Sequence, residues 1–200
     1  MSGRLKHFLI YAIYPQVKGY FSLSTLTRAY RFYRGGEIVL KKEGKPITSP
    51  LQISRERYQE IITKNNKPKN GDILLTAVGT LGVSYLVQNE EFYFKDGNVI
   101  WFKDFHNKGL NLYLYDYMQS PSFKDMIDEI TIGSTQNAIT IATIGKRNVL
   151  KPNHGTLLCY HDISEALNRK ICITKDSNLR LYEMKSLILS KLSKEEGYGK

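Results

Sequence analysis

Short apolar runs separated by polar turns dominate the chain up to about residue 102. The run at 72–78 has too few polar positions to alternate, which is typical of a strand buried on both faces. A tight turn with two glycines follows it. We therefore expect strands at residues 37–42, 72–78, 83–87 and 99–102.

Helical spacing of apolar residues appears twice in the middle of the chain. Residues 54–62 place Tyr58, Ile61 and Ile62 on one face, with Ser54 available as the N-cap. Residues 112–118 and 122–130 form a second helical stretch, divided at Ser120-Pro121. Beyond them we expect a polar loop at 133–137, a strand at 138–141 and a break at 151–153.

The last third of the chain has a different pattern. Ile163, Leu167 and Ile171, and then Leu181, Met184, Ile188 and Leu192, recur at intervals of three, four and seven residues. The segment 162–165 has the spacing of a capping box, so it predicts a helix start there. The pattern fits one long helix or a pair interrupted near 174–177, packed either on its own domain or on a partner helix.

These elements predict an α/β (α+β) fold with a mixed or antiparallel sheet, followed by a long C-terminal helix for dimerisation or spacing. We expect two parts: a globular domain over residues 1–155 and a helical region over residues 156–200.

The net charge of +10 is concentrated at one end of the chain. Residues 1–70 contain 14 Lys/Arg and 4 Asp/Glu, whereas residues 71–200 contain 15 of each. Such an asymmetric field favours polyanionic partners, with nucleic acid first and an anionic membrane surface second. The alternative is that the excess of positive charge only keeps the protein in solution and binds no partner.

The sequence lacks the patterns of the common enzyme classes. There is no Walker A, GxSxG or GxGxxG motif, and no methyltransferase tetrapeptide. The spacing of His154, Cys159, His161 and Cys172 matches no zinc template. Two cysteines form no disulfide framework, and no apolar run is long enough to cross a membrane, so we expect a cytoplasmic protein without metal, cofactor or catalysis.

Three segments, in this order, resemble one known family. They are ISRERY at 53–58 followed by NGDILLTAVGTLG at 70–82, then YMQSPSF at 117–123 with IGSTQNAI at 132–139, and finally LYEMKSLILSKL at 181–192. The chain resembles the DNA-specificity subunits of type I restriction–modification enzymes. The resemblance covers roughly residues 50–195, about half of a full subunit, which carries two recognition domains and two helical regions.

The resemblance implies a non-catalytic protein whose recognition domain reads double-stranded DNA. Its helices would pack antiparallel and dock modification subunits and, through the complex, restriction subunits. It would direct adenine methylation and ATP-dependent cleavage by those partners. The stripe of Leu181, Met184, Ile188 and Leu192 would be the assembly face, and it could also pair with its own copy as a homodimer.

Basic and amide side chains supply the candidate DNA contacts. Arginines can read guanine, lysines neutralise phosphates, and Gln or Asn can pair with adenine. Arg28, Arg31 and Arg34 would share a face on a helix but not on a strand. Gln136 and Asn137 could equally serve to close their polar loop. The candidates are Arg28, Arg31 and Arg34; Lys41, Lys42 and Lys45; Lys64, Lys67 and Lys69; and Gln136 and Asn137.

Two other functions stay open from the sequence. The chain could be a basic adaptor that binds a modification subunit without reading DNA. A stand-alone nuclease is the weaker alternative, because Glu43-Gly44-Lys45 has no aspartate before it in the chain.

Overall fold

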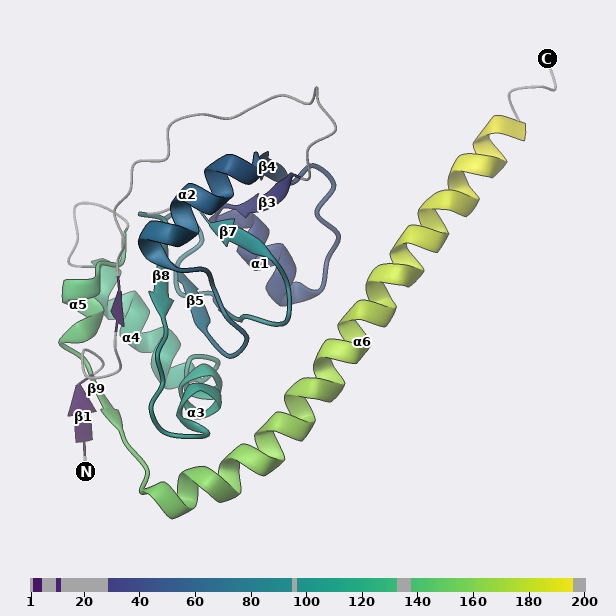
Figure 1. Cartoon of the computed structure of the whole chain (residues 1–200). Helices are drawn as coiled ribbons and strands as arrows, with labels where there is room; N and C mark the ends of the chain where they lie inside the picture. Colours follow the sequence, from purple (N-terminus) through teal and green to yellow (C-terminus); the bar gives the residue numbers. More distant parts are fainter. Residues whose placement is uncertain (1, 5–9, 12–28, 95–96, 133–137, 196–200) are drawn as a thin grey trace.

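Helices and small sheets alternate along the chain until one long helix leaves the globular body (Figure 1). The computed structural model describes residues 2–4, 10–11, 29–94, 97–132 and 138–195. The predicted α+β class, with mixed and antiparallel sheets and a long C-terminal helix, is confirmed.

Nine strands form three sheets within the described residues. The largest has the order β2–β8–β5–β6, and all of its pairings are antiparallel. In the second, β3 pairs antiparallel with β4 and parallel with β7, and the third pairs β1 with β9. The strands are β1 (Ser2–Arg4), β2 (Ile10–Tyr11), β3 (Tyr30–Tyr33), β4 (Leu51–Ile53), β5 (Ile73–Thr76), β6 (Ser84–Leu86), β7 (Phe92–Phe94), β8 (Val99–Phe102) and β9 (Asn148–Leu150).

Six helices surround and extend these sheets in the part of the chain that the structure describes. They are α1 (Gly35–Glu43), α2 (Arg55–Asn65), α3 (Leu110–Tyr117), α4 (Pro121–Ile132), α5 (Ile141–Gly145) and α6 (His154–Glu195). The predicted helices at 54–62, 112–118 and 122–130 are confirmed as α2, α3 and α4. Ser54 caps α2 as expected, accepting a hydrogen bond from the Arg57 amide at 3.2 Å.

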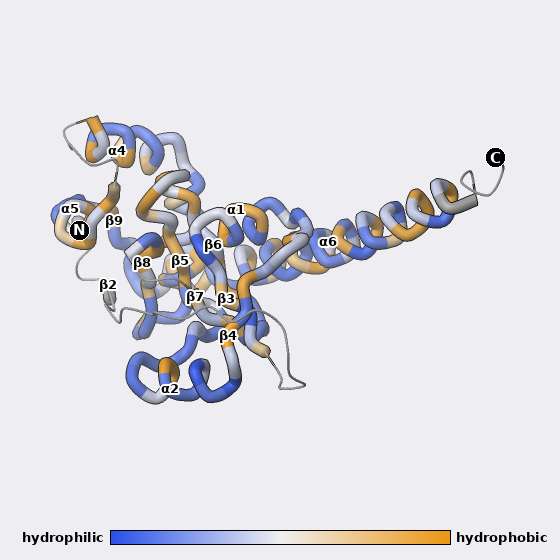
Figure 2. The backbone as a smooth tube through the Cα atoms, turned by 90° about the horizontal axis from the view of Figure 1, so that it is seen from above, coloured by the Kyte–Doolittle hydropathy of each residue, from blue (hydrophilic) through white to orange (hydrophobic). Residues whose placement is uncertain are grey.

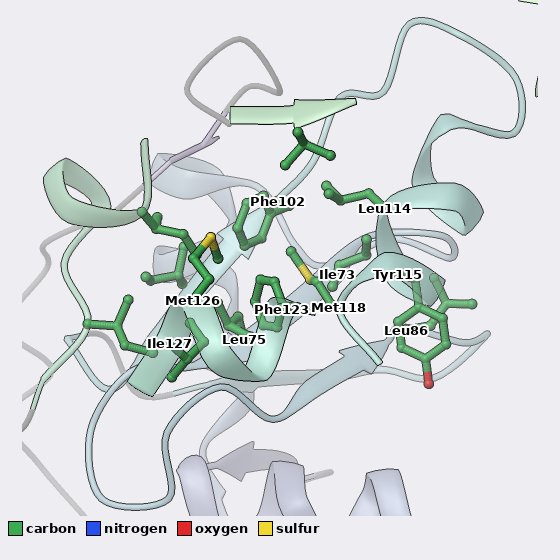
Figure 3. Close-up of a cluster of buried hydrophobic side chains, with 14 of the residues drawn as sticks. Ile73, Leu75, Leu86, Phe102, Leu114, Tyr115, Met118, Phe123, Met126 and Ile127 are labelled. Atoms are coloured by element: carbon green, nitrogen blue, oxygen red, sulfur yellow. The ribbon is translucent and has the colours of Figure 1, made fainter. Parts of the chain in front are cut away.

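The main core lies between the large sheet and the helices α3 and α4. All four residues of β5 are buried, as the unbroken apolar run predicted. Ile73 and Leu75 contact a cluster that includes Leu114 of α3 and Phe123 of α4 (Figure 3). Leu74, between them in the sequence, belongs to a second cluster with Tyr33 and Trp101 on the opposite face. Burial on both faces is what fixes β5 at the centre of the domain.

The predicted strand at 37–42 is wrong, because these residues form α1. The β-branched pair Ile38-Val39 favours a strand, but local capping decides for a helix. The Glu37 carboxylate accepts hydrogen bonds from the backbone amide and guanidinium of Arg34, closing a capping box. Gly44 ends the helix in the left-handed conformation, with φ +68°.

Two other predicted boundaries are also wrong. Within 138–141, Ala138 makes only an isolated bridge to Val78, and α5 begins at Ile141. Thr140 caps α5, so the capping signal again overrides the apolar alternation. The long helix starts at His154 rather than at 162, because the Asn153 side chain accepts a hydrogen bond from the Thr156 amide at 2.8 Å. It then runs without interruption through 174–177.

Candidate nucleic-acid interface and assembly helix

The first half of α6 docks on α3 of the globular body. Leu157 is buried there, and Asp116 accepts hydrogen bonds from Tyr160, at 2.5 Å, and from Ser164, at 2.8 Å. Burial and the bond to Asp116 raise the pKa of the Tyr160 phenol to about 12. Gly109 permits this close approach, because a Cβ there would lie 2.4 Å from the Leu157 carbonyl oxygen.

A second contact joins α6 to the end of α1. The Lys175 ammonium donates to the Lys42 carbonyl oxygen at 2.5 Å, where unsatisfied carbonyls and the helix dipole favour a cation. A Cβ at Gly44 would lie 2.9 Å from Lys175 Cγ. The absence of a side chain at Gly44 therefore permits both the left-handed turn and the close approach of α6.

Lys42 points into the globular body rather than into solvent. Its ammonium donates to the Tyr115 hydroxyl at 2.8 Å and to Gln119 Oε1 at 2.5 Å. Burial, followed by the nearby charge of Lys175, lowers the pKa of Lys42 to about 8. Lys42 thus holds α1 against α3.

Lys41 is also engaged within the domain. Its ammonium lies 2.7 Å from Glu90, which in addition accepts a hydrogen bond from Tyr85. These groups line an open pocket of about 290 Å³ between the domain and α6, together with Ile171, Cys172 and Lys175. Lys41 is neutralised there by Glu90, whereas Lys175 donates to a neutral backbone carbonyl oxygen.

The arginine group does not share a helical face. Arg31 lies on strand β3, where its side chain is exposed, and Arg34 is the N-cap residue of α1. The Arg34 guanidinium bonds Glu37, with the shortest distance at 2.5 Å. Of the alternatives left open by the sequence, the structure therefore selects the strand for Arg31. Arg28, like Gln136 and Asn137, lies outside the described residues.

The remaining candidate lysines are exposed. Lys45 contacts Glu43 at 2.7 Å on the surface. Lys64 lies in the last turn of α2, and Lys67 and Lys69 lie in the loop that leads to β5. Lys67 lies 3.4 Å from Glu91, at a site where both side chains are about half exposed, and such pairs exchange readily with other ions. The loop itself is ordered by Asp72, which accepts from the Lys69 amide at 2.9 Å.

The predicted assembly residues are exposed beyond the docked part of α6. Leu181, Met184, Ile188 and Leu192 are 52–60% exposed, whereas apolar side chains of the domain are mostly buried. Figure 2 shows apolar and polar residues alternating along this extended helix. An apolar stripe of this kind, left in water, marks an interaction surface.

Sequence reasoning missed the junction between α6 and the body. Lys175 entered only as part of a suspected interruption, and Asp116 carried no signal at all. Their partners are 133 and 48 residues away in the chain for the Lys175–Lys42 and Ser164–Asp116 bonds, so no local pattern reveals them.

Membrane spans and metal clusters are both absent from the part of the chain that the structure describes. None of the helices is both long and apolar enough to cross a membrane. No group of three or more His, Cys, Asp or Glu side chains is placed to hold a metal ion.

Comparisons with known proteins find relatives in sequence and in structure. No protein-family model matches the chain. A putative type I restriction enzyme specificity subunit of Haemophilus influenzae is 42% identical over 65 residues, which are 32% of this chain and 17% of that protein. A chain from a structure of the type I R-M system covers 97% of this chain, with 15% identity and a TM-score of 0.53.

The chain spans less than half of either protein, since it covers 45% of the structural neighbour. The structural likeness, at this identity, concerns the fold alone. The sequence match does not depend on that likeness. The chain therefore resembles the specificity subunits of type I restriction–modification enzymes.

Proposed function

We propose that this chain is a sequence-specific DNA-recognition part of a type I restriction–modification system. It would direct adenine methylation and ATP-dependent cleavage that partner subunits carry out, while it performs no catalysis itself. The observation that carries this proposal is the 42% identity over 65 residues to a protein named as a specificity subunit. The domain at 1–155 would read DNA, and the helical region at 156–200 would assemble the complex.

The exposed basic residues are the best candidates for contact with DNA. Arg31 on β3 and Lys64, Lys67 and Lys69 around the end of α2 are exposed and can approach a phosphate. They would fix the position of the duplex rather than read bases. Arg28, Gln136 and Asn137 stay candidates for base contacts, and Lys45 for a phosphate.

The engaged basic residues are weaker candidates in this proposal. Moving Lys42 to DNA would break its hydrogen bonds to Tyr115 and Gln119, and moving Lys41 would leave Glu90 without its cation. Arg34 would likewise have to exchange the Glu37 carboxylate for DNA. Each exchange would leave a largely buried acceptor, namely Tyr115, Glu90 or Glu37, without its partner, which opposes it.

The exposed stripe of α6 would bind the modification subunits, and through them the restriction subunits, or a second copy of the chain. Changing Leu181 and Ile188 to glutamate places charges on this surface, far from the domain core. We expect the double variant to keep a folded domain and to lose its partners. Unchanged mass and unchanged binding of modification subunits would reject this assignment.

Methylation mapping tests the proposed function directly. The chain is co-expressed with a type I modification subunit from the same genome, and methylated adenines are mapped on plasmid DNA. A single split motif that disappears without this chain is the expected result. Failure to form any complex with the modification subunit would reject the proposal.

A basic adaptor is the second candidate function, and one observation favours it. Three of the predicted DNA contacts, Arg34, Lys41 and Lys42, are bonded to other side chains of the domain. An adaptor would form the complex with modification subunits but leave no methylated motif. It would also tolerate replacement of Arg31 and of Lys64, Lys67 and Lys69 by glutamine.

A further inference from the structure

The open pocket between the domain and α6 is built from three separate segments of the chain. Lys41, Gly44 and Lys45 come from the end of α1 and the turn after it, residues 88–90 come from the connection between β6 and β7, and the opposite wall comes from α6. Its volume of about 290 Å³ lies just below the range of roughly 300–1,000 Å³ that holds drug-sized ligands. The pocket therefore has room for a small molecule.

Ammonium groups determine the charge of this pocket. Both oxygens of the Glu90 carboxylate are engaged, one by Lys41 and the other by the Tyr85 hydroxyl. The Asp176 carboxylate is exposed, so water screens its charge. The charged side chains that line the pocket are three lysines and two acids, an excess of one positive charge: Lys41, Lys45 and Lys175 against Glu90 and Asp176.

Lys175 is the best placed of these lysines to bind an anion. It is partly buried, and its hydrogen bond to the neutral Lys42 carbonyl oxygen occupies one of the three N–H groups of its ammonium. Burial lowers the pKa of Lys175, and the positive charge of Lys41 acts in the same direction. An anion in the pocket would reduce the repulsion between these two ammonium groups.

Lys42 adds a further positive charge behind the wall of the pocket. Its two hydrogen-bond acceptors are neutral, and one of them, the Tyr115 hydroxyl, belongs to a residue that lines the pocket. Burial, and after it the charge of Lys175, lowers the pKa of Lys42 to about 8, although Asp116 opposes this shift. Two partly buried ammonium groups that repel each other are thus hydrogen-bonded to neutral acceptors, and a nearby anion would stabilise both.

We propose that this pocket binds a small, free phosphate-bearing molecule, with Lys175 as its main ligand and Lys41 and Lys45 beside it. A phosphate group carries a charge of about −1.5 to −2 at neutral pH and three strong acceptor oxygens, more than a carboxylate offers to ammonium groups on two elements. The bound group would connect α6 with the end of α1 and so stabilise the docking of the long helix. This site is separate from the proposed recognition of DNA and does not depend on it.

The two cysteines of the chain test the site without any substitution. Cys172 lines the pocket, whereas Cys159 is exposed on an earlier turn of α6 and is the internal control. The full-length chain is alkylated with N-ethylmaleimide in inorganic phosphate or in potassium chloride of equal ionic strength, and mass spectrometry follows each cysteine. When phosphate is at about ten times its dissociation constant, about one site in eleven stays free, so alkylation of Cys172 should slow about tenfold. The rate at Cys159 should not change.

A phosphate titration of the melting temperature gives a second measurement and identifies the ligands. We expect a rise that saturates with phosphate, and a dissociation constant at least about tenfold higher in Lys175→Gln, because a charge-assisted bond is lost. Lys45→Gln should weaken binding less, since Lys45 is exposed, and Lys185→Gln, outside the pocket on α6, should not weaken it. Equal alkylation of Cys172 at every phosphate concentration, or an unchanged dissociation constant in Lys175→Gln, would overturn the proposal.

Duplex DNA distinguishes a free phosphate from the phosphates of a nucleic acid. We expect a duplex oligonucleotide to leave the alkylation of Cys172 unchanged, and protection of Cys172 by the duplex would overturn the assignment to a free molecule. The variant with Lys64, Lys67 and Lys69 replaced by glutamine should keep its protection by phosphate. A chain that directs a methylated motif but shows no effect of phosphate would overturn this inference and leave the proposed function intact.

Discussion

The ammonium group of Lys175, in the middle of α6, donates a hydrogen bond to the carbonyl oxygen of Lys42 in the last turn of α1. A side chain of the long helix thus completes the carboxyl end of a helix in the globular body. Together with the bonds from Tyr160 and Ser164 to Asp116, it fixes the long helix to the domain at two separate points.

Replacing Lys175 with alanine should loosen one of these two points. We expect a loss of about 0.5–2 kcal/mol in the free energy of unfolding, because the hydrogen bond to the Lys42 carbonyl oxygen disappears. Amide hydrogen exchange should become faster at residues 40–45. Lys185→Ala, at an exposed position of the same helix, is the control and should leave both measurements unchanged.

Two glycines of the same region should respond in opposite ways to alanine. Gly44 has φ +68°, and a Cβ there would lie 2.9 Å from Lys175 Cγ, so Gly44→Ala should cost about 1–3 kcal/mol. Gly36, in the first turn of α1, has nothing within 4 Å of a new Cβ. Gly36→Ala should leave stability unchanged or raise it by up to about 1 kcal/mol. Equal effects in urea titrations would contradict the role given to Gly44.

Lys42 should give the stability of the protein a specific pH dependence. Burial lowers its pKa in the folded state to about 8, from an ordinary value of 10.5. Between these values the unfolded chain binds more protons, so the contribution of Lys42 to stability rises with pH. Below pH 8 both states are protonated and the charged group opposes folding.

The measurement is chemical denaturation at pH 7.5 and 9.5. The gain in stability on going to the higher pH should be smaller in Lys42→Met than in the original chain. Lys175, whose pKa burial also lowers, contributes with the same sign and remains in both proteins. An identical gain in the two proteins would mean that Lys42 is not desolvated.

The exposed lysines should determine how DNA binding depends on salt. Replacing Lys64, Lys67 and Lys69 with glutamine should reduce the slope of log affinity against log salt by up to about 2.7, if each lysine contacts one phosphate. Affinity should fall for all DNA sequences alike, since phosphate contacts carry no base information. Lys124→Gln, an exposed lysine on α4, is the control. An unchanged slope would remove these lysines from the interface.

The sequence predicted the central elements of the fold because their signals are local. The unbroken apolar run of β5 and the Ser54 cap of α2 act over a few residues, and both are confirmed. At α1 two local signals compete: Ile38 and Val39 favour a strand, whereas the Arg34–Glu37 capping box and Gly44 favour a helix. The structure shows that the caps decide.

The sequence predicted the candidate site only as a region rich in basic residues. Counting basic residues identifies the first third of the chain, but it does not distinguish Lys64, which is exposed, from Lys41, which Glu90 neutralises from 49 residues away. The same holds for Lys42, whose partner Gln119 lies 77 residues along the chain. Which lysines are available to a partner is decided by tertiary packing.

Because α6 is uninterrupted, a small change in its angle at the domain moves its far end by a larger distance. Twenty residues separate Lys175 from the end of the helix at Glu195, which corresponds to about 30 Å of rigid rod. A tilt of about 10° at the docking contacts would displace the far end by about 5 Å, more than the diameter of a water molecule and enough to misalign any interface there. The few hydrogen bonds at Asp116 and Lys42 therefore determine the position of anything that binds the far end of the helix.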